Sequence, residues 1–406
     1  MHRIAFYSHD TMGLGHVRRN LALARAIVDR HVDVSILLIS GTHLGGAFHM
    51  PAGIDCITLP ALGKHQMTGA YSARHLSCPL DHIVGLRSQT IRAALERFDP
   101  HLLIVDNVPL GALGELEPTL AALRMGRRIK TVLGLRDILD EPSVVAREWA
   151  AAGHHASIER YYDQVWIYGD PSVYDLSEEC HFPESTRHRV RFVGYLDRRS
   201  PHDSEAAAST GAALARPFTL CLAGGGQDGT ELALAFSESS FPGGETGVLL
   251  TGPFCPEPAL KHVRAVAATR DDFHLIDFTD DGASLVERAT RVVGMAGYNS
   301  VCEILAYRKP ALLVPREAPR REQTIRATRF AEIGLVDVLA QRDLSSQALT
   351  RWMATVKTSL RPATLRFTAL EQVPRLVSNL LSPDQQPTMR PIAAKTRATG
   401  AGVHVH

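Results

Sequence analysis

A glycine turn between a predicted strand and a predicted helix carries the clearest chemistry in the chain. The strand covers Arg291–Gly294 and the helix Val301–Tyr307, and the turn includes Gly297, Tyr298, Asn299 and Ser300. Such a turn presents backbone N–H groups and a helix N-terminus to an anion, at the strand end where ligands bind in α/β proteins. Glu303 follows one helical turn later, placed to accept hydrogen bonds from a ribose diol. These residues predict half of a nucleotide-binding site.

Two polar residues beyond the next strand extend this site. The buried strand Ala311–Pro315 leads through a charged loop to Glu322 and Gln323, where another helix begins. Their side chains can hydrogen-bond further hydroxyl groups of a bound sugar. We expect this pair to set the specificity for the sugar.

A second glycine turn has the same context earlier in the chain. The strand Phe218–Ala223 precedes it and the helix Thr230–Ser237 follows it, and the turn contains Gly224, Gly225, Gly226 and Gln227. A triple glycine also occurs in plain loops. Its place between a strand and a helix N-terminus nevertheless favours phosphate binding.

The first turn of the chain carries a histidine. It follows the strand Arg3–Ser8, contains Gly13 and Gly15, and ends at His16, from which a helix runs to Arg30. A histidine of near-neutral pKa in a cleft can take a proton from a hydroxyl group. The alternative is that His16 merely caps the turn, and the residues alone favour neither. The third glycine and the downstream acid of a dinucleotide-binding motif are missing, so no such cofactor is predicted.

Two further polar residues follow predicted strands of the first half. Asp106 ends the strand that begins at Leu102, and Arg136 follows the strand Lys130–Leu135. Ligands bind at this edge of an open α/β sheet, so both are candidates for the acceptor side of a cleft. Polar residues at strand ends more commonly serve only as turn formers.

The elements that must position these residues alternate between strand and helix, which predicts doubly wound α/β domains with parallel sheets. A single helix is expected at Ser143–Tyr161, and a mobile loop at Gly63–Cys78. The hydrophobic pattern lapses after the strand Arg191–Leu196. We therefore expect a first domain at 1–197, a linker at 198–216, a second domain at 217–364, and a disordered tail at 382–406.

Length and composition limit the classes of function. A chain of 406 residues can form two domains, and its net charge of +1 argues against a nucleic-acid-binding surface. The six cysteines are scattered without a close pair, which suits a reducing compartment. No apolar run approaches the roughly 20 residues that span a bilayer, and no signal peptide is evident. We expect a cytoplasmic protein.

Basic residues on one predicted helix raise a further possibility. The helix Ile83–Phe98 carries Arg87, Arg92 and Arg97 among apolar residues. Such a helix can contact an anionic membrane surface, here the inner face of the cell membrane. More often it is simply a solvated face.

The turn at Gly297 and the residues after it resemble the donor-site signature of the GT-B glycosyltransferases of family 28, the MurG-like group. In that signature a Ser-Gly turn precedes a ribose-binding Glu, matched by Glu303, and a Gln pair reads the sugar, matched by Glu322 and Gln323. The triple-glycine turn is similar to the GGSQGA loop of these enzymes, with Gln227 at the matching Gln. The turn at His16 is similar to their acceptor-side GGTGGH loop.

The resemblance implies a GT-B fold, in which two Rossmann-like domains face each other across a cleft and a last helix, at 365–381, returns to the first domain. It implies that Phe278 packs on a uracil base and that Thr279 offers its main chain to that base, although Phe278 alone suggests a core residue. It further implies that a sugar passes from a UDP-linked donor, with inversion, to an acceptor glycan, lipid-linked sugar or small molecule. His16 would be the general base, and neither metal nor cofactor would be needed.

Two residues depart from the family pattern. Met295 stands where MurG-like proteins tend to carry Arg, and Glu322 replaces the first Gln of the pair. The donor therefore need not be UDP-N-acetylglucosamine.

Other functions fit part of the same pattern. The first turn is also similar to the GxGHxxR loop of related nucleotide-sugar hydrolases, in which His16 would activate water and Arg19 supplies the Arg. The full-sized first domain favours an acceptor larger than water. A non-catalytic nucleotide-sugar-binding protein and an epimerase on the same fold are further alternatives.

Overall fold

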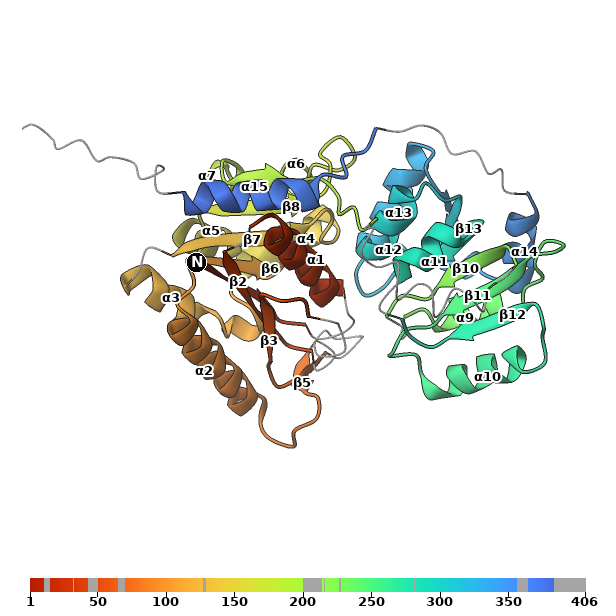
Figure 1. Ribbon diagram of the computed structural model, residues 1–406, viewed down its shortest axis with the longest axis horizontal. Helices are drawn as coiled ribbons and strands as arrows, with labels where there is room; N and C mark the ends of the chain where they lie inside the picture. Colours follow the sequence, from red (N-terminus) through yellow and green to blue (C-terminus); the bar gives the residue numbers. More distant parts are fainter. Residues whose placement is uncertain are drawn as a thin grey trace, which may run out of the picture.

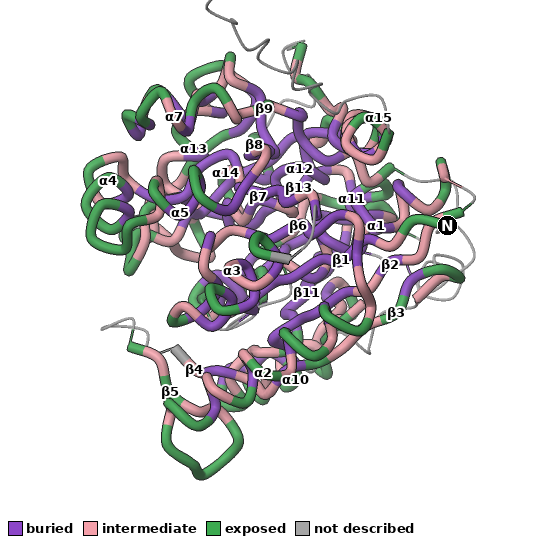
Figure 2. The backbone as a smooth tube through the Cα atoms, turned by 90° about the vertical axis from the view of Figure 1, so that its left-hand side faces the viewer, coloured by how far each residue is buried: buried purple, intermediate pink, exposed green. Residues whose placement is uncertain are grey.

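The structure is a computed structural model that describes residues 1–10, 15–31, 33–42, 50–64, 70–126, 129–199, 214, 216–225, 228–279, 282–355 and 364–382. Its two large sheets are parallel, which confirms the expected α/β class (Figure 1). The central strands β1 (His2–Ser8), β6 (Leu102–Asp106) and β7 (Lys130–Arg136) lie in the buried interior, whereas α4 (Pro142–Ala151) and α7 (Glu184–Arg187) lie at the periphery with many exposed residues (Figure 2). Parallel strands covered on both faces read as near-continuous apolar runs, which is why the sequence predicted them.

The first sheet has seven strands in the order β3-β2-β1-β6-β7-β8-β9. Their bounds are β1 (His2–Ser8), β2 (Val34–Ser40), β3 (Ile54–Thr58), β6 (Leu102–Asp106), β7 (Lys130–Arg136), β8 (Gln164–Tyr168) and β9 (Val190–Phe192). The other described helices around it are α1 (Gly15–Arg30), α2 (Leu80–Phe98), η2 (Ala112–Gly114), α3 (Glu117–Gly126), α5 (His154–Tyr161) and α6 (Leu176–Glu179). The central β6 is buried at every position.

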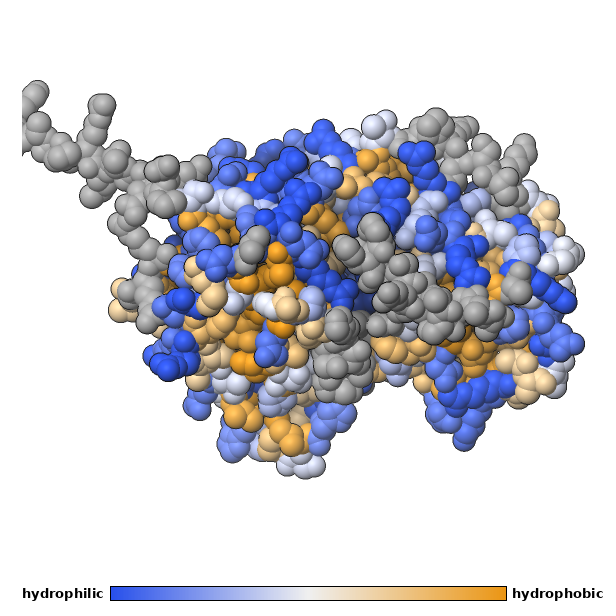
Figure 3. All heavy atoms as spheres, viewed as in Figure 1, coloured by the Kyte–Doolittle hydropathy of each residue, from blue (hydrophilic) through white to orange (hydrophobic). Residues whose placement is uncertain are grey.

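The second sheet has six strands in the order β12-β11-β10-β13-β14-β15. Their bounds are β10 (Phe218–Leu222), β11 (Thr246–Leu250), β12 (Phe273–Ile276), β13 (Arg291–Gly294), β14 (Ala311–Leu313) and β15 (Asp337–Val338). The accompanying described helices are α9 (Thr230–Ser237), α10 (Glu257–Ala267), α11 (Gly282–Arg288), α12 (Tyr298–Ala306), α13 (Glu322–Glu332), η4 (Gln341–Asp343) and α14 (Ser346–Thr355). Hydrophilic residues gather over α10 on the face in Figure 3, while Ala259 and Val263 of this helix are buried.

The last described helix, α15 (Ala369–Leu381), crosses back to the first sheet and lies against α1 (Figure 1). Its buried Val373 and Val377 share a hydrophobic cluster with Val17 and Leu21 of α1. Polar contacts accompany this packing, because Nε2 of His31 lies 3.2 Å from the Pro374 carbonyl oxygen and 3.3 Å from the Ser378 hydroxyl oxygen. The N-terminal half of the molecule is therefore covered in part by residues from the end of the described chain.

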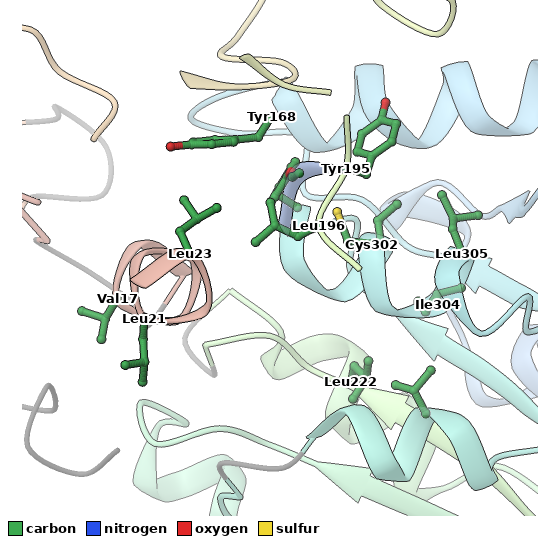
Figure 4. Packing of buried hydrophobic residues seen from close by; sticks show 14 of the residues in the cluster. Val17, Leu21, Leu23, Tyr168, Tyr195, Leu196, Leu222, Cys302, Ile304 and Leu305 are labelled. Carbon is green, nitrogen blue, oxygen red and sulfur yellow. The ribbon is translucent and has the colours of Figure 1, made fainter. Parts of the chain in front are cut away.

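The two halves of the molecule meet along a seam that is both apolar and charged. Tyr195 and Leu196 lie beside Cys302 of α12, within one cluster that spans both halves (Figure 4). Arginines of α13 and its preceding loop pair with carboxylates of the first half: Arg320 with Asp140, Arg321 with Glu141, Arg326 with Asp137, and Arg329 with Glu179. The Arg326–Asp137 pair is buried. It stabilises this arrangement of the two halves as long as both side chains are charged, because removing one charge would leave the other buried and unpaired.

Two sequence expectations about the first half were wrong. The helix predicted at Ser143–Tyr161 is divided into α4 and α5, because Gly153 adopts a left-handed φ of +62° and ends the first helical run. The loop expected at Gly63–Cys78 includes a short antiparallel hairpin of β4 (Leu62–Lys64) and β5 (Tyr71–Ala73). Leu62 anchors the hairpin, since it is fully buried against Ile83.

The basic surface expected on α2 is also smaller than predicted. Arg87 is fully buried and pairs with the buried Glu115 at 2.5 Å, while its Nη1 donates to the Pro60 carbonyl at 2.6 Å. Arg87 lies on the buried face of the helix together with Ile83 and Ile91. No helix among the described residues is long and apolar enough to span a bilayer.

Candidate functional site

A cavity lies between the two halves, where the carboxyl ends of both sheets meet. It is lined by thirteen of the predicted site residues: Gly15, His16, Arg19, Arg136, Gly224, Gly225, Phe278, Thr279, Gly297, Tyr298, Asn299, Ser300 and Glu303. Three others, Asp106, Glu322 and Gln323, lie behind this first layer. Gly13, Gly226 and Gln227 fall outside the described residues.

The N-terminus of α12 forms one wall of the cavity with its main chain. The helix begins at Tyr298, and no side chain caps its first turn. Gly297 has an ordinary φ of −65°, and a Cβ at this position would meet no atom within 4 Å. The glycine therefore leaves open space above N–H groups that have no partner within the helix, which is the arrangement that binds an anion.

The second glycine turn is held close to a neighbouring turn of the same sheet. Gly252, with φ of +80°, follows β11, and a Cβ there would approach the Gly224 carbonyl oxygen to 2.5 Å. Only glycine permits this contact between the two turns. Gly224 and Gly225 line the cavity beside the α12 terminus, so both predicted anion-binding turns face the same space.

Glu303, the predicted ribose ligand, is already paired with an arginine. Its Oε1 accepts a hydrogen bond of 2.7 Å from Nη1 of Arg198, and its side chain is only 4% exposed. Arg198 belongs to the segment expected to link the two domains. The carboxylate therefore meets the cavity in a fixed orientation, with its charge balanced by the linker arginine.

Glu322 and Gln323 do not line the cavity, because Arg316 lies across them. Nη2 of Arg316 donates to Glu322 Oε1, and its main-chain N–H donates to Gln323 Oε1 at 3.1 Å. The same guanidinium donates to Asp228 Oδ2 at 2.5 Å, on the second glycine turn. Arg316 thus connects the predicted sugar-reading pair to the predicted phosphate-binding turn.

His16 is oriented by a buried carboxylate. Its Nδ1 lies 2.9 Å from Oδ2 of Asp106, which is 1% exposed at the end of β6. The role of Nδ1 depends on the tautomer, because Nη2 of Arg19, which only donates, lies 3.0 Å from the same nitrogen. With the proton on Nδ1, the imidazole donates to Asp106 and Nε2 is able to accept a proton. An imidazole held in this tautomer can act as a general base.

Arg19 shares the same carboxylate. Its Nη2 donates to Asp106 Oδ1 at 2.5 Å and to Oδ2 at 2.7 Å. Burial would raise the pKa of Asp106, but Arg19 and His16 outweigh burial and hold this pKa well below its ordinary value. Asp106 is therefore charged throughout the physiological pH range.

Aromatic rings and a hydrogen bond connect the cluster of His16, Arg19 and Asp106 to the α12 wall of the cavity, here called the donor wall. The Arg19 guanidinium lies 5.5 Å from the Tyr168 ring and 5.7 Å from the Tyr298 ring, distances at which cation–π attraction operates. The Asn299 amide donates to the Gly15 carbonyl oxygen at 3.0 Å. Tyr298 and Asn299, predicted as donor ligands, thus also join the donor wall to the His16 turn.

Phe278 lies at the cavity with 39% of its surface exposed, which contradicts the reading of this residue as part of the core. An exposed ring at a cavity is suited to pack on a flat ligand group. Thr279 lines the cavity beside it.

Two arginines that shape the site were not among the predicted residues. Arg198 falls in a stretch without periodicity, and Arg316 follows the Pro that ends a predicted strand. Each acts through a carboxylate that is distant in sequence or across a loop, so no local pattern identifies the partner.

Part of the chain matches a known protein family. Residues 246–368 match the glycosyltransferase family 28 C-terminal domain. A UDP-N-acetylglucosamine--N-acetylmuramyl-(pentapeptide) pyrophosphoryl-undecaprenol N-acetylglucosamine transferase from Burkholderia vietnamiensis is 36% identical over 102 residues. That match covers 23% of this chain and 28% of the relative, so the chain spans little more than a quarter of the length of the curated protein it matches.

Solved structures extend the likeness to nearly the whole chain. MurG from Acinetobacter baumannii superimposes with a TM-score of 0.52 at 15% identity, covering 95% of this chain and 96% of that one. The UDP-GlcNAc 2-epimerase from Methanocaldococcus jannaschii gives 0.57 at 10% identity, covering 93% and 100%. These likenesses confirm the GT-B fold and, with the family match, the predicted resemblance to MurG-like glycosyltransferases. At such identities the structures inform on the fold alone.

Proposed function

We propose that the protein is an inverting glycosyltransferase that moves a sugar from a UDP-linked donor to an acceptor hydroxyl without a metal ion. The acceptor is a glycan, a lipid-linked sugar or a small molecule. The observation that carries the proposal is the pairing of His16 with the buried Asp106, across one cavity from the uncapped N-terminus of α12. The cavity thus has a base on one wall and an anion-binding helix terminus on the other.

On the donor wall, main-chain N–H groups of the α12 turn and of the turn at Gly224 would bind the diphosphate. Such preorganised dipoles stabilise charge that develops on a leaving group. Glu303 would hold the ribose hydroxyls and Phe278 would pack on the base. Arg316 would hold Glu322 and Gln323 in place behind the sugar.

On the opposite wall, Nε2 of His16 would take the proton of the acceptor hydroxyl. The acceptor oxygen then forms a bond to the anomeric carbon as the bond from that carbon to the phosphoryl oxygen breaks. Attack from the face opposite the leaving group inverts the anomeric centre. Asp106 would stabilise the imidazolium formed in this step, because its carboxylate lies 2.9 Å from Nδ1.

The first test is a thermal-shift screen of the intact chain against UDP-, dTDP-, ADP- and GDP-linked sugars. A ligand that binds only the folded state stabilises it by about 2.7 kcal/mol at one hundred times its Kd. We expect UDP-linked sugars to raise Tm, and Glu303→Ala to reduce the shift. A screen in which no nucleotide sugar raises Tm would overturn the proposal.

The second test separates transfer from the other activities of nucleotide-sugar-binding folds. The sugar that gives the largest shift is supplied in radiolabelled form with and without extracted lipid and glycan acceptors. Transfer predicts labelled acceptor together with free UDP. Stoichiometric free sugar without acceptor, abolished by His16→Ala, would instead identify a hydrolase, and an interconverted donor with intact nucleotide an epimerase. Tight binding with no turnover would leave a non-catalytic binding protein.

We further propose that the chain acts in the cytoplasm. All six cysteines are free thiols, which suits a reducing compartment. Peripheral contact with the inner face of the membrane is the corresponding proposal for a lipid-linked acceptor. Sedimentation with vesicles of phosphatidylglycerol, compared with vesicles of phosphatidylcholine, tests it.

A further inference from the structure

The arginines around the cavity are not equivalent in their pairing. Four of them have carboxylate partners: Arg19 with Asp106, Arg198 with Glu303, Arg316 with Glu322, and Arg326 with Asp137. Arg136 lines the same cavity, yet within the described part of the chain no carboxylate pairs with it and its buried Nε has no hydrogen-bond partner. An anion bound in the cavity could therefore serve as its partner.

The surroundings of Arg136 disfavour its charge. Burial lowers the pKa of its guanidinium, and the nearby Arg326 and Arg19 lower it further, whereas Glu322 and Asp137 oppose this change. Glu322 gives one oxygen to Arg316. Arg136 is half-buried, and a partly desolvated cation without a carboxylate partner costs stability, so a bound anion would relieve this penalty.

The position of Arg136 is fixed relative to the opposite wall. Arg136 is the last residue of β7, and the next residue, Asp137, pairs with Arg326 of α13. Nη2 of Arg326 lies 2.6 Å from Asp137 Oδ1, and both side chains are 1% exposed. Nη1 of Arg326 also donates to the Ala296 carbonyl oxygen at 2.9 Å, just before the α12 turn. The buried Arg326 thus links Asp137, the residue next to Arg136, to the anion-binding turn.

The cavity wall facing Arg136 consists of the glycine turns at Gly224 and Gly297, which suit a diphosphate. The acidic neighbour of Arg136 in the other half is Glu322, at the end of the site where the sugar is expected. We propose that Arg136 binds the phosphoryl group that carries the sugar, and so completes from the N-terminal half a diphosphate site otherwise built from main-chain N–H groups. This inference rests on the proposed function, because it takes a nucleoside diphosphate as the ligand.

The proposal gives Arg136 a role in the transfer step. When the bond between the anomeric carbon and the phosphoryl oxygen breaks, its electron pair stays on that oxygen, which gains negative charge. The proton of the acceptor hydroxyl passes to His16. Arg136 faces the oxygen that gains charge, so its attraction is stronger in the transition state than in the ground state and lowers the barrier.

The experiment measures binding of UDP and UMP by isothermal titration calorimetry to wild-type protein, Arg136→Met and Arg136→Lys. A charge-assisted hydrogen bond predicts that Arg136→Met weakens UDP binding about 10- to 100-fold. UMP, which lacks the second phosphoryl group, should change less than about threefold. Arg136→Lys should fall between wild type and Arg136→Met, because it keeps the charge but loses the planar fork.

Two controls keep the result interpretable. Arg97→Met removes an exposed arginine of the same half and should alter neither affinity. Thermal unfolding without ligand should show Arg136→Met at least as stable as wild type, since a partly desolvated cation without a carboxylate partner is removed.

The possible outcomes separate this inference from the proposed function. Wild-type protein that binds no UDP overturns both. Wild-type protein that binds UDP, with Arg136→Met binding it equally well, overturns the inference alone and leaves the donor site intact. Equal weakening of UDP and UMP places Arg136 on the other phosphoryl group and also overturns it. Unchanged UDP affinity with a raised KM for the acceptor would assign Arg136 to an anionic acceptor instead.

Discussion

The two walls of the cavity are built from different chemical groups. The C-terminal wall presents main-chain N–H groups at an uncapped helix N-terminus and beside closely packed glycines. The N-terminal wall presents side chains, namely His16 and Arg136, supported by buried Asp106 and Arg19. A wall made of main-chain N–H groups requires glycine at fixed positions, which leaves a recognisable sequence pattern. In a wall made of side chains, the residue types can change with the acceptor. The family match at residues 246–368 includes the α12 turn, and it excludes both the Gly224 turn and the first half.

The largest effect should come from the side-chain wall. We expect His16→Ala to lower kcat about 10³-fold, within the range for loss of a general base, while the Kd for UDP stays within twofold. Steady-state kinetics and calorimetry on the same preparation measure both. His188→Ala, an exposed histidine far from the cavity, serves as the matched control. A comparable loss of UDP affinity in His16→Ala would mean that the two walls do not divide binding and chemistry as described.

Asp106→Asn should affect stability as well as rate. It leaves the buried Arg19 without its charge partner, so we expect a loss of about 3 kcal/mol in the free energy of unfolding at neutral pH. The folded-state pKa of Asp106 lies below its unfolded value of about 3.9, so its contribution is complete above that value and disappears as pH falls through the folded pKa. Urea unfolding between pH 7 and pH 2 should therefore show a gap between wild type and variant that is constant above about pH 5 and narrows progressively below about pH 4. A gap that stays constant with pH would exclude the charge as its cause.

Gly297→Asp tests the main-chain wall directly. The φ and ψ of Gly297 suit an N-cap residue, so an Asp there should cap α12 and raise stability by up to about 1 kcal/mol. The same carboxylate would occupy the N–H groups and repel a phosphate, so UDP affinity should fall about 10-fold or more. Gly297→Ala adds a methyl group into open space and is the control. Undiminished UDP binding by Gly297→Asp would show that the α12 terminus is not the anion site.

The smallest effect is expected for Ser300→Ala. If the donor wall acts through its main chain, removing this hydroxyl should change the Kd for UDP by less than about threefold, because the N–H group remains. A loss of 10-fold or more, measured by calorimetry, would show that the wall also depends on a side chain.

The parts of the site that local chemistry determines were predictable from the sequence. The strand at Arg291–Gly294, the turn after it and Glu303 on the next helix follow from apolar runs, glycine and helical spacing. Arg136 was placed at the strand end where ligands bind, but its lack of a partner depends on which carboxylates other residues use.

The parts that depend on distant partners were not predictable. Nothing near Arg198 in the sequence indicates that it pairs with Glu303, which is 105 residues away. In the sequence, Arg87 has the character of a solvated basic residue. Its partner Glu115 is 28 residues away and comes close only in the folded chain. The apolar character of Phe278 wrongly suggested a core residue, because exposure depends on the loop around it.

The packing of α15 against α1 has a consequence for biosynthesis. The part of α1 that packs on α15 stays uncovered until Val373 and Val377 have left the ribosome. The first sheet can therefore assemble early, whereas the wall that carries the base acquires its full support only when nearly all of the described chain has been made. Ribosome-bound chains arrested before residue 369 should remain sensitive to protease at α1, and chains arrested well beyond residue 381 should be resistant. The support of the His16 wall is therefore added after the strands of both sheets have been made.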